Sequence, residues 1–534
     1  MKRVASRTSR VFFVGATALL LWAARGCNFS AGLKMNGGNA GAGTAGASGA
    51  AGASGVAGAG GSGTAGAFGT AGALGTAGAT PPTACMNLQC QQSTCGGFGT
   101  CTVPACPNGG RTTVSGKTYD PAGKTPLYNI TVYVPNAALA DINDGPSCDP
   151  CDPKTGTSLL SGQPVVIAKS DETGTFHLGM TGVGDVPAGT NIPLVIQDGK
   201  WRRQVTIPTV TACQDNVLTD VNLTRLPRTK AEGHIPKMAL TTGQSDAMEC
   251  LLRKIGIDDS EFTADDGMGR VNLFTGGGGS SSFAAAPASG SATFTPVHPA
   301  AGGADWWDSL DNLKKYDILL HSCEGGQGSY TATQDPGSVK SPQARMVLQQ
   351  YADMGGRVFA SHWHAYWFEK GTPDFMSVAT FLNPHGGKLP NPTDTTIDQS
   401  FDKGKSLAKW MIDPAVMGST TLGIVSIAQD ASNTEVAMAA GPPISQRWLY
   451  APTQNNTVVF LSATTPIPNA TTPKPAACGR AVLSDLHVSA GGVGSDMPDT
   501  PFPMGCVTTD LSPREKVLEF MLFDIASCVQ PIVQ

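Results

Sequence analysis

The densest group of chemically active side chains in this sequence lies between residues 353 and 368. A short apolar run at 358–360 leads there into Ser361-His362-Trp363-His364. Imidazole transfers protons near neutral pH and is the commonest metal-binding side chain in proteins. Residues two apart on an extended segment point to the same side, so we expect His362 and His364 to act together on one ligand.

Two further polar clusters also follow apolar runs. His321, Cys323 and Glu324 come at the end of the run that begins at residue 316, and Asp485 and His487 follow the run at 481–484. In a sheet of parallel strands between helices, ligands bind outside the carboxyl ends of the strands. We therefore expect the three clusters to meet in one crevice that offers four histidines, a thiol and two carboxylates.

The region 226–534 alternates strands and helices in a way that would place these clusters together. Apolar runs predict strands at 237–240, 271–274, 316–321, 358–361, 458–462 and 481–484. Residues typical of helix N-termini stand at Ser245, Ser341 and Ser512. The pattern predicts a doubly wound α/β fold with a mainly parallel sheet. Residues 386–450 are expected to form an insertion, either a lid over the crevice or an extension of the sheet.

Residues 109–225 have a different pattern, in which short runs alternate apolar and polar residues. Turn residues such as Asp198-Gly199 separate these runs. Strands are expected at 113–119, 130–134, 165–168, 175–178, 192–196, 204–207 and 218–223. Many short strands at regular spacing are typical of a β-sandwich, so the chain is expected to have at least two domains.

The N-terminus has the features of a secretory signal peptide. Basic residues precede an apolar run at 11–22, which is about half as long as the roughly 20 residues that span a membrane. Gly26-Cys27 resembles the lipobox of bacterial lipoproteins, which implies a lipid on Cys27 and a place in the cell envelope. The alternative is ordinary removal of residues 1–27 and free secretion. Either way the chain is exported, and it would touch a membrane only through a lipid anchor.

Residues 28–82 consist almost wholly of Gly, Ala, Ser and Thr. Such a segment cannot bury enough apolar surface to offset the entropy of ordering it, so a disordered linker is expected. The cysteine-rich segment 83–108 follows, with five cysteines about five residues apart and without the C-x-x-C pairs of a zinc site. A small disulfide-linked knot is the expected structure there.

Disulfides are expected because the chain has fourteen cysteines and is predicted to be exported. Five is an odd number, so one cysteine of the knot should pair outside it, for instance with Cys213. Near the C-terminus, Cys478 and Cys506 are expected to pair with each other or with Cys528.

The charge pattern excludes one class of partner. Charged residues make up only 14% of the chain, the net charge is −5, and no run of Lys and Arg occurs. Proteins that bind nucleic acid need clustered positive charge to neutralise phosphates. Nucleic acid is therefore not an expected partner.

Two parts of the chain resemble known families. The segment 116–134, GKTYDPAGKTPLYNITVYV, followed by SDETGTFHL at 170–178, resembles the carboxypeptidase regulatory-like domain, which has a transthyretin-type fold. That resemblance implies a spacer or binding module. YDILLHSCEGG at 316–326 and QQYADMGGRVFASHWH at 349–364 resemble the class I glutamine amidotransferase-like superfamily, in particular its trehalose-utilisation (ThuA-like) branch.

The second resemblance implies an amidotransferase-like fold without glutamine hydrolysis. Amidotransferases of this class carry Gly-x-Cys-x-Gly at the turn after the nucleophile strand, and here His362 occupies the position of that cysteine. Cys323 lies one strand earlier. It could still act as a nucleophile, with His362 or His321 as its base, if its thiol is free and within hydrogen-bond reach. The alternatives are a buried structural cysteine or a disulfide with Cys250.

A divalent metal site is a further interpretation of the crevice. His362 and His364, joined by His487 or by a carboxylate such as Asp485 or Glu324, would supply the three protein ligands of a catalytic zinc site. Such a chain would be a metal-dependent hydrolase of the cell surface.

The leading interpretation is a binding module for a glycan or another small polar ligand, without a cofactor. Flat apolar rings at Trp363, Tyr366 and Trp367, close to the Trp306-Trp307 pair, would contact the ligand, and His321 and His487 would bond to it. In the enzymatic alternatives His362, Cys323, Glu324 and Asp485 are the candidate catalytic residues. The remaining alternative is a structural surface protein whose crevice is vestigial.

Overall fold

The computed structural model describes residues 85–94, 101–151, 159–180, 184–299, 304–326, 340–382, 387–428, 432–433, 436–439, 444–469, 471, 475–488, 500–530 and 532. The predicted signal peptide, Cys27 and the Gly/Ala-rich linker lie outside these ranges. Contacts within the chain separate Met1–Ala77 from a compact unit, Gly78–Gln534. In the ranges described, the helices are all too short or too polar to cross a membrane.

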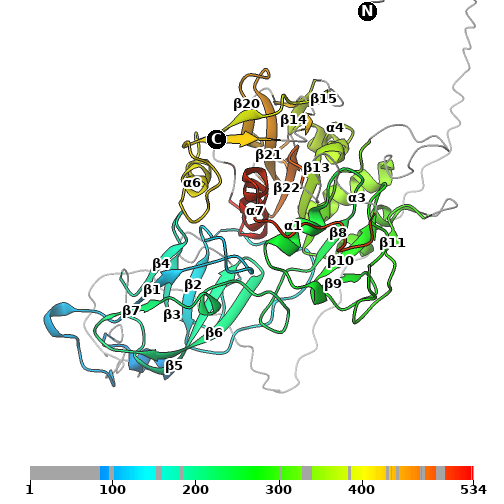
Figure 1. The fold of residues 1–534 in the computed structure, drawn as a ribbon. Coiled ribbons are helices and arrows are strands. Elements are labelled where there is room, and N and C mark those ends of the chain that lie inside the picture. The colour runs from blue at the N-terminus through cyan, green and yellow to red at the C-terminus, as the bar shows by residue number, and fades with distance from the viewer. Residues whose placement is uncertain are drawn as a thin grey trace, which may run out of the picture. The chain divides into compact units, whose positions relative to one another are not determined.

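The first part of this unit consists mainly of β-strands (Figure 1). They are β1 (Thr113–Lys117), β2 (Thr131–Pro135), β3 (Pro164–Lys169), β4 (Thr175–Leu178), β5 (Gly189–Asp198), β6 (Trp201–Val210) and β7 (Asp215–Leu218). The strand order is β4-β1-β7 in one sheet and β3-β2-β5-β6 in the other. The strand predicted at 218–223 is wrong in its bounds, because Asp220 accepts a hydrogen bond from the Asn222 amide and caps a 3₁₀ helix, Val221–Leu223.

The second part of the unit is built on one large mixed sheet (Figure 1). Its parallel half has the order β10 (Val271–Thr275), β8 (Met238–Thr241), β12 (Ile318–His321), β13 (Arg357–Ser361) and β22 (Gly479–Ser484). Its other half is antiparallel, with the order β21 (Thr457–Thr465), β20 (Gln446–Ala451), β16 (Thr393–Ile397) and β17 (Ile424–Ile427). The expectation of a mainly parallel sheet is therefore wrong for this half.

The predicted insertion at 386–450 supplies much of the antiparallel half. It contributes β16, β17 and β20 to the sheet, together with α6 (Asp402–Met411). The described residues of the insertion thus form an extension of the sheet, which is one of the two structures expected for residues 386–450; the other was a lid. Shorter strands are β9 (Phe262–Ala264), β11 (Thr295–Pro296), β14 (Ala379–Phe381), β15 (Gly387–Lys388), β18 (Ser432–Asn433) and β19 (Val436–Met438).

Helices pack on both faces of the large sheet. Successive side chains of a strand point to opposite faces. Leu240 and Leu320 accordingly lie in a core with residues of α1 (Met248–Lys254) and α7 (Pro513–Ala526). Leu319 and Val358 lie in a second core with residues of α3 (Pro342–Asp353). The remaining short helices are α2 (Leu310–Leu313), α4 (Tyr366–Glu369) and α5 (Pro373–Met376).

Two of the three predicted helix starts are confirmed. Ser341 caps α3 and is followed by a proline, and Ser512 caps α7 in a capping box with Glu515. Ser245 is not a cap, because α1 begins three residues later with Ala247 as its N-cap. The Ser245 amide instead donates a hydrogen bond to the carbonyl of Cys323, at 3.0 Å.

The β-rich part and the large sheet share one hydrophobic core. Val132 and Trp201 of the first part belong to the same buried cluster as Phe520 of α7. The Tyr128 and Phe520 rings stack with centroids 6.0 Å apart. The indole of Trp410 donates to the carbonyl of Pro126 at 2.7 Å. The expected boundary near residue 226 therefore separates segments of sequence that are packed together.

Disulfides also connect the two parts. Pairs in which both cysteines are described include Cys85–Cys90, Cys106–Cys213, Cys148–Cys478, Cys151–Cys528 and Cys250–Cys506. The expected bond from the cysteine-rich segment to Cys213 is confirmed. The expected pairing among Cys478, Cys506 and Cys528 is wrong, because each of them bonds to a cysteine far away in the sequence.

Two carboxyl groups are buried against each other where the β-rich part meets α7. Asp120 is 1% exposed and Glu519 is fully buried. Burial raises the pKa of Asp120 to about 7, and burial together with the negative charge of Asp120 raises the pKa of Glu519 well above its usual range. The folded chain thus holds protons that the unfolded chain releases above about pH 4. By linkage, this pair lowers the stability as the pH rises from about 4 through 7.

Replacing Glu519 by glutamine should remove this penalty. We expect E519Q to raise the free energy of unfolding at pH 8 by roughly 1–3 kcal/mol, since one pKa unit is worth about 1.4 kcal/mol. At pH 5 the gain should largely disappear. Chemical denaturation at both pH values measures it. Glu261 is a matched control, because it is also buried but accepts hydrogen bonds from two backbone amides. An equal gain for E261Q, or a gain for E519Q that does not depend on pH, would contradict the prediction.

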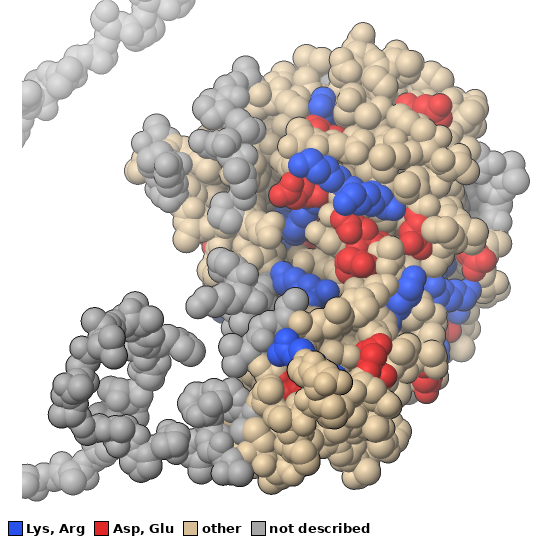
Figure 2. Space-filling model, turned by 90° about the vertical axis from the view of Figure 1, so that its left-hand side faces the viewer, with Lys and Arg blue, Asp and Glu red and all other residues tan. Residues whose placement is uncertain are grey.

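The surface carries charges of both signs. Figure 2 shows one face on which the Lys and Arg side chains are interspersed with those of Asp and Glu. A groove of about 790 Å³ is lined by residues of the same mixed character, including Lys124, Arg253, Asp258 and Asp510. Lys124 pairs with Asp510, and Arg253 pairs with Asp259. This mixture offers neither a cation nor an anion a field of one sign.

Candidate metal centre

Three neighbouring parallel strands end at the same edge of the large sheet. His321 at the end of β12 lies opposite Ala360 of β13, and Ser361 lies opposite Ser484 of β22. The residues that follow these strands are therefore brought together, as the sequence predicts. In the order β10-β8-β12-β13-β22, β10 lies on one side of β8, and the strands that come later in the sequence lie on the other side. The boundary between β8 and β12 is therefore a topological switch point, where ligands bind in parallel sheets of this kind.

Among the described residues, Cys323, His362 and His487 form a close group of potential metal ligands. One ligand atom from each residue lies within 4.8 Å of the other two, and all three side chains are buried. The sulfur of Cys323 is 3.4 Å from Nδ1 of His362. The rings of His362 and His487 are 5.2 Å apart. Each residue comes from a different strand end, so the fold itself assembles the group.

The backbone at His362 is strained. Its φ is +34°, in the left-handed region that non-glycine residues rarely adopt. The chain turns here from β13 into the 3₁₀ helix His362–Ala365. Such strain costs on the order of 1–3 kcal/mol and is concentrated at functional sites. At this turn the His362 ring lies beside the sulfur of Cys323.

The Cys323 thiol is not part of a disulfide. It is fully buried, and its expected alternative partner Cys250 bonds to Cys506. Burial raises the pKa of Cys323, so without a bound cation its sulfur stays protonated. Nucleophilic cysteines need a lowered pKa and some exposure. A metal ion, in contrast, displaces the thiol proton when it binds.

The donor set of this group fits a transition metal. Zinc binds thiolate and imidazole together, and catalytic zinc sites take three ligands from the protein. Calcium and magnesium prefer oxygen ligands, which this group lacks. The three residues therefore fit an ion of the zinc class.

His364 lies in a neighbouring group and not with His362 and His487. Its Nδ1 accepts a hydrogen bond from the Trp367 indole at 3.0 Å, and its ring stacks on His321 at 5.0 Å. Burial lowers the pKa of His321 to about 3 and the pKa of His364 well below its usual range, so both rings stay neutral. The expectation that His362 and His364 share a side assumed extended backbone, which the 3₁₀ helix replaces.

Glu324 is occupied by a buried ion pair. Its carboxylate is 2.5 Å from the ammonium of Lys340, and both side chains are 2% exposed. It also accepts a hydrogen bond from the Gly277 amide at 3.2 Å, and lies 3.8 Å from Nε2 of His364. The Lys340 ammonium lies over the ring of Trp307 at 4.9 Å. Lys340 carried no signal in the sequence, because it belongs to no motif and precedes a helix cap.

The candidate stacking residues differ in what they offer to a ligand. Trp367 is 1% exposed, and Trp307 is fully buried. Trp363 and Tyr366 are half-buried, and the Trp363 ring is 5.2 Å from the ring of His362. Of the aromatic rings predicted to contact a ligand, Trp363 and Tyr366 are thus the ones that remain partly exposed to solvent.

Asp485 and Asp246 are two further buried acids close to this edge. Asp485 is 2% exposed, and its amide donates to the carbonyl of Val459 at 2.8 Å. Its carboxylate is outside the three-donor group. Asp246 is fully buried, and its carboxylate bonds to Ser361 and to the Val488 amide. No sequence pattern selects Asp246, because it follows the first strand of the region and belongs to no motif.

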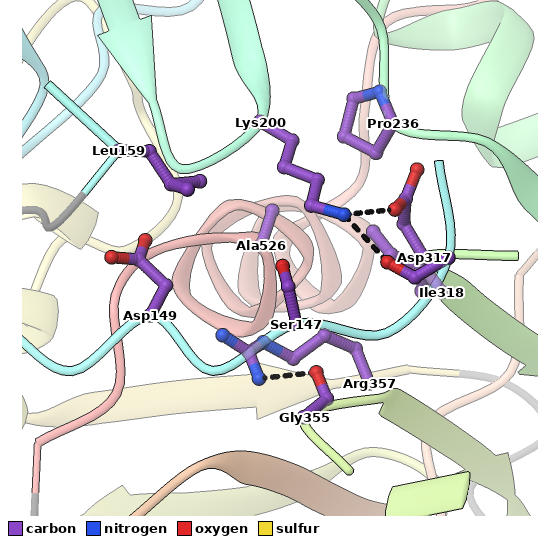
Figure 3. Close-up of a pocket in the computed structure, with 11 residues that line it drawn as sticks. Ser147, Asp149, Leu159, Lys200, Pro236, Asp317, Ile318, Gly355, Arg357 and Ala526 are labelled. Atoms are coloured by element: carbon purple, nitrogen blue, oxygen red, sulfur yellow. Dashed lines mark hydrogen bonds and ion pairs between the residues drawn. The ribbon is translucent and has the colours of Figure 1, made fainter. Parts of the chain in front are cut away.

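A separate small cavity lies at the opposite edge of the sheet, where β12 and β13 begin. Figure 3 shows Lys200, from the turn between β5 and β6, reaching Asp317 beside Ile318. The ammonium and carboxylate are 2.5 Å apart, and Arg357 donates to the carbonyl of Gly355 at 2.9 Å. The cavity of about 20 Å³ has room for about one water. The cavity is lined by residues of both the β-rich part and the large sheet, and it is too small for a substrate.

Comparisons with known proteins add little to this geometry. Neither the family models nor the curated proteins contain a match to the chain. Among solved structures, a cytoplasmic protein of Salmonella typhimurium, STM3548, is similar over 47% of this chain and 88% of its own length. It is 13% identical in sequence, with a TM-score of 0.22, which is too low to support an argument about fold or function.

Proposed function

We propose that this chain is a metal-dependent hydrolase whose single ion, of the zinc class, is held by Cys323, His362 and His487. The observation that carries the proposal is the approach of one thiol and two imidazoles, from three separate strand ends, to within 4.8 Å of one another. This replaces the ligand set expected from the sequence, in which His364 took the place of the thiol. A zinc ion with three protein ligands supplies Lewis-acid and water-activating chemistry.

The residues around the group have separate tasks in this proposal. Cys323 would release its proton to bind the ion, and its thiolate would supply the negative charge that offsets the cost of burying a cation. His362 and His487 would supply the other two ligand atoms, one ring nitrogen each. Trp363 and Tyr366 contact the substrate beside the ion. Lys340 and Glu324 form a buried ion pair directly after Cys323 in the sequence, so the charge of Glu324 is compensated by Lys340.

A cysteine nucleophile is the second candidate for the chemistry. The free thiol of Cys323 and its 3.4 Å contact with His362 favour it, because these are the two conditions a Cys–His pair must meet. Full burial of the thiol, and the raised pKa that follows from it, oppose it. Alkylation separates the two candidates: iodoacetamide should react quickly with a catalytic thiolate and slowly with the metal-free thiol described here.

The family resemblances fit the same proposal. The two small sheets of residues 109–225 are consistent with a transthyretin-type β-sandwich, and the strand order of the parallel half is consistent with a doubly wound, amidotransferase-like fold. A sugar or another polar ligand with an apolar face would suit Trp363 and Tyr366. The proposed place of action is the cell envelope or the exterior, in agreement with the disulfides among the described residues and the signal-like N-terminus.

Metal analysis of the full exported chain tests the proposal. Metal-free protein should take up one equivalent of Co²⁺, with the charge-transfer absorption of a cobalt–thiolate bond. After exchange into Zn²⁺ it should hydrolyse one class within a panel of nitrophenyl esters, phosphates and glycosides, and the metal-free protein should not. Failure to bind a stoichiometric ion would overturn the metal site. Binding without hydrolysis of any class would leave a metal-binding protein and overturn the enzyme.

A further inference from the structure

One short loop contacts all three segments that carry the proposed ligands. It comprises residues 243–246, in the connection between β8 and α1. The Ser245 amide donates to the carbonyl of Cys323 at 3.0 Å. The two oxygens of Asp246 accept hydrogen bonds from the Ser361 hydroxyl at 2.5 Å and from the Val488 amide at 2.8 Å. Ser361 immediately precedes His362, and Val488 immediately follows His487.

The loop lies tightly against the strand end that carries Cys323. A Cβ atom on Gly243 would be 2.3 Å from the Cys323 carbonyl oxygen, so only glycine allows this approach. Asp246 is fully buried, as are Cys323 and Ser361. A buried carboxylate with two charge-assisted hydrogen bonds is held firmly in one orientation. The loop is therefore a rigid support in contact with three otherwise separate strand ends.

We propose that Asp246 is the positioning residue that fixes the distance between His362 and His487 and thereby sets the metal affinity of the site. The inference rests on the proposed metal centre. One planar carboxylate bonds to the residue before one imidazole and to the residue after the other, so the backbone segments that carry the two rings cannot move apart without breaking a hydrogen bond to it. Groups that orient metal ligands in this indirect way are typically worth about 10- to 100-fold in metal affinity.

A merely structural role for Asp246 would give a different result. In that case its loss would lower the free energy of unfolding but leave metal affinity unchanged in the molecules that stay folded. Asp185 provides the matched control. It is also fully buried and accepts hydrogen bonds from the Thr112 amide at 3.2 Å and the Thr94 hydroxyl at 2.9 Å, but it lies in the β-rich part.

The experiment measures Zn²⁺ affinity by competition with a chelator in the full chain, together with thermal unfolding of the metal-free protein. D246A is expected to bind Zn²⁺ about 10- to 100-fold more weakly, and to keep the cobalt–thiolate absorption because all three ligands remain. D246N retains one hydrogen-bond acceptor and should lose less Zn²⁺ affinity than D246A. It replaces D246A in the experiment if D246A does not fold. D185A should be destabilised with unchanged affinity.

The outcomes separate this inference from the proposal it rests on. If the wild-type chain binds no stoichiometric metal, the metal centre itself fails. If the wild type binds metal, and folded D246A and D246N bind it as tightly, the metal centre stands and the role of Asp246 is overturned. S361A, which removes one of the two hydrogen bonds, should weaken binding less than D246A. A larger loss for S361A would contradict the geometry.

Discussion

Replacing Cys323 by alanine is expected to weaken Zn²⁺ binding by a factor on the order of 10² to 10³. Structural zinc sites bind with roughly 10–16 kcal/mol shared among their ligands, so one ligand is worth about 3–4 kcal/mol. Cys323 supplies the only sulfur within the described group and, once the metal binds, its only negative charge. The cobalt–thiolate absorption should disappear completely in the variant. Titration of metal-free protein with Co²⁺, and chelator competition for Zn²⁺, measure both effects.

The control for this prediction is His364. The sequence suggests it as a ligand, whereas the structure places it against Trp367 and His321. H364N should therefore keep the cobalt–thiolate absorption and bind Zn²⁺ within about threefold of the wild type, although its folded state will be less stable. Equal losses in C323A and H364N would show that the site collapses whenever its surroundings change. Such a result would end the assignment of Cys323 as a ligand.

Removing the Cys148–Cys478 disulfide is expected to lower the free energy of unfolding by about 4 kcal/mol. With Cys151–Cys528 still in place, the loop that this bond closes comprises roughly fifty residues, the segments 148–151 and 478–528 together. Opening it returns conformational entropy to the unfolded chain. The double variant C148A/C478A avoids an unpaired thiol. Denaturant unfolding of oxidised protein measures the change.

A short disulfide supplies the comparison. Cys85–Cys90 spans five residues, so the same argument gives about 2 kcal/mol for C85A/C90A. The ratio of the two losses tests the entropic account directly. If C148A/C478A were no less stable than C85A/C90A, the cross-link between the two parts of the chain would be incidental to stability.

Local patterns in the sequence predict the elements that form the edge of the site. The apolar runs before His321, Ser361 and Asp485 each form a strand of the parallel half. β12 and β13 run in the same direction because α3 connects them, so a convergence of the polar residues at their ends is predictable. The helix caps at Ser341 and Ser512 are equally local and are also found.

Features that depend on residues far apart in the sequence cannot be predicted from local patterns. The antiparallel half of the sheet is one example, because β16 and β17 carry no local mark of the strands they pair with. The identity of the three-donor group is another. It depends on a single turn at His362 that removes His364 from the strand direction. Asp246 and Lys340 matter only through contacts with residues that are remote in the sequence.

The shared core has a consequence for how this chain can change over time. β-Rich modules of this size are commonly gained, lost or exchanged as independent units. Here Tyr128 stacks on Phe520, and Trp201 contacts Phe523, so α7 is shaped to the module that precedes it. A recombination event near residue 226 would expose these aromatic rings to solvent. Homologous chains are therefore expected to inherit both parts together or to replace the whole inner face of α7.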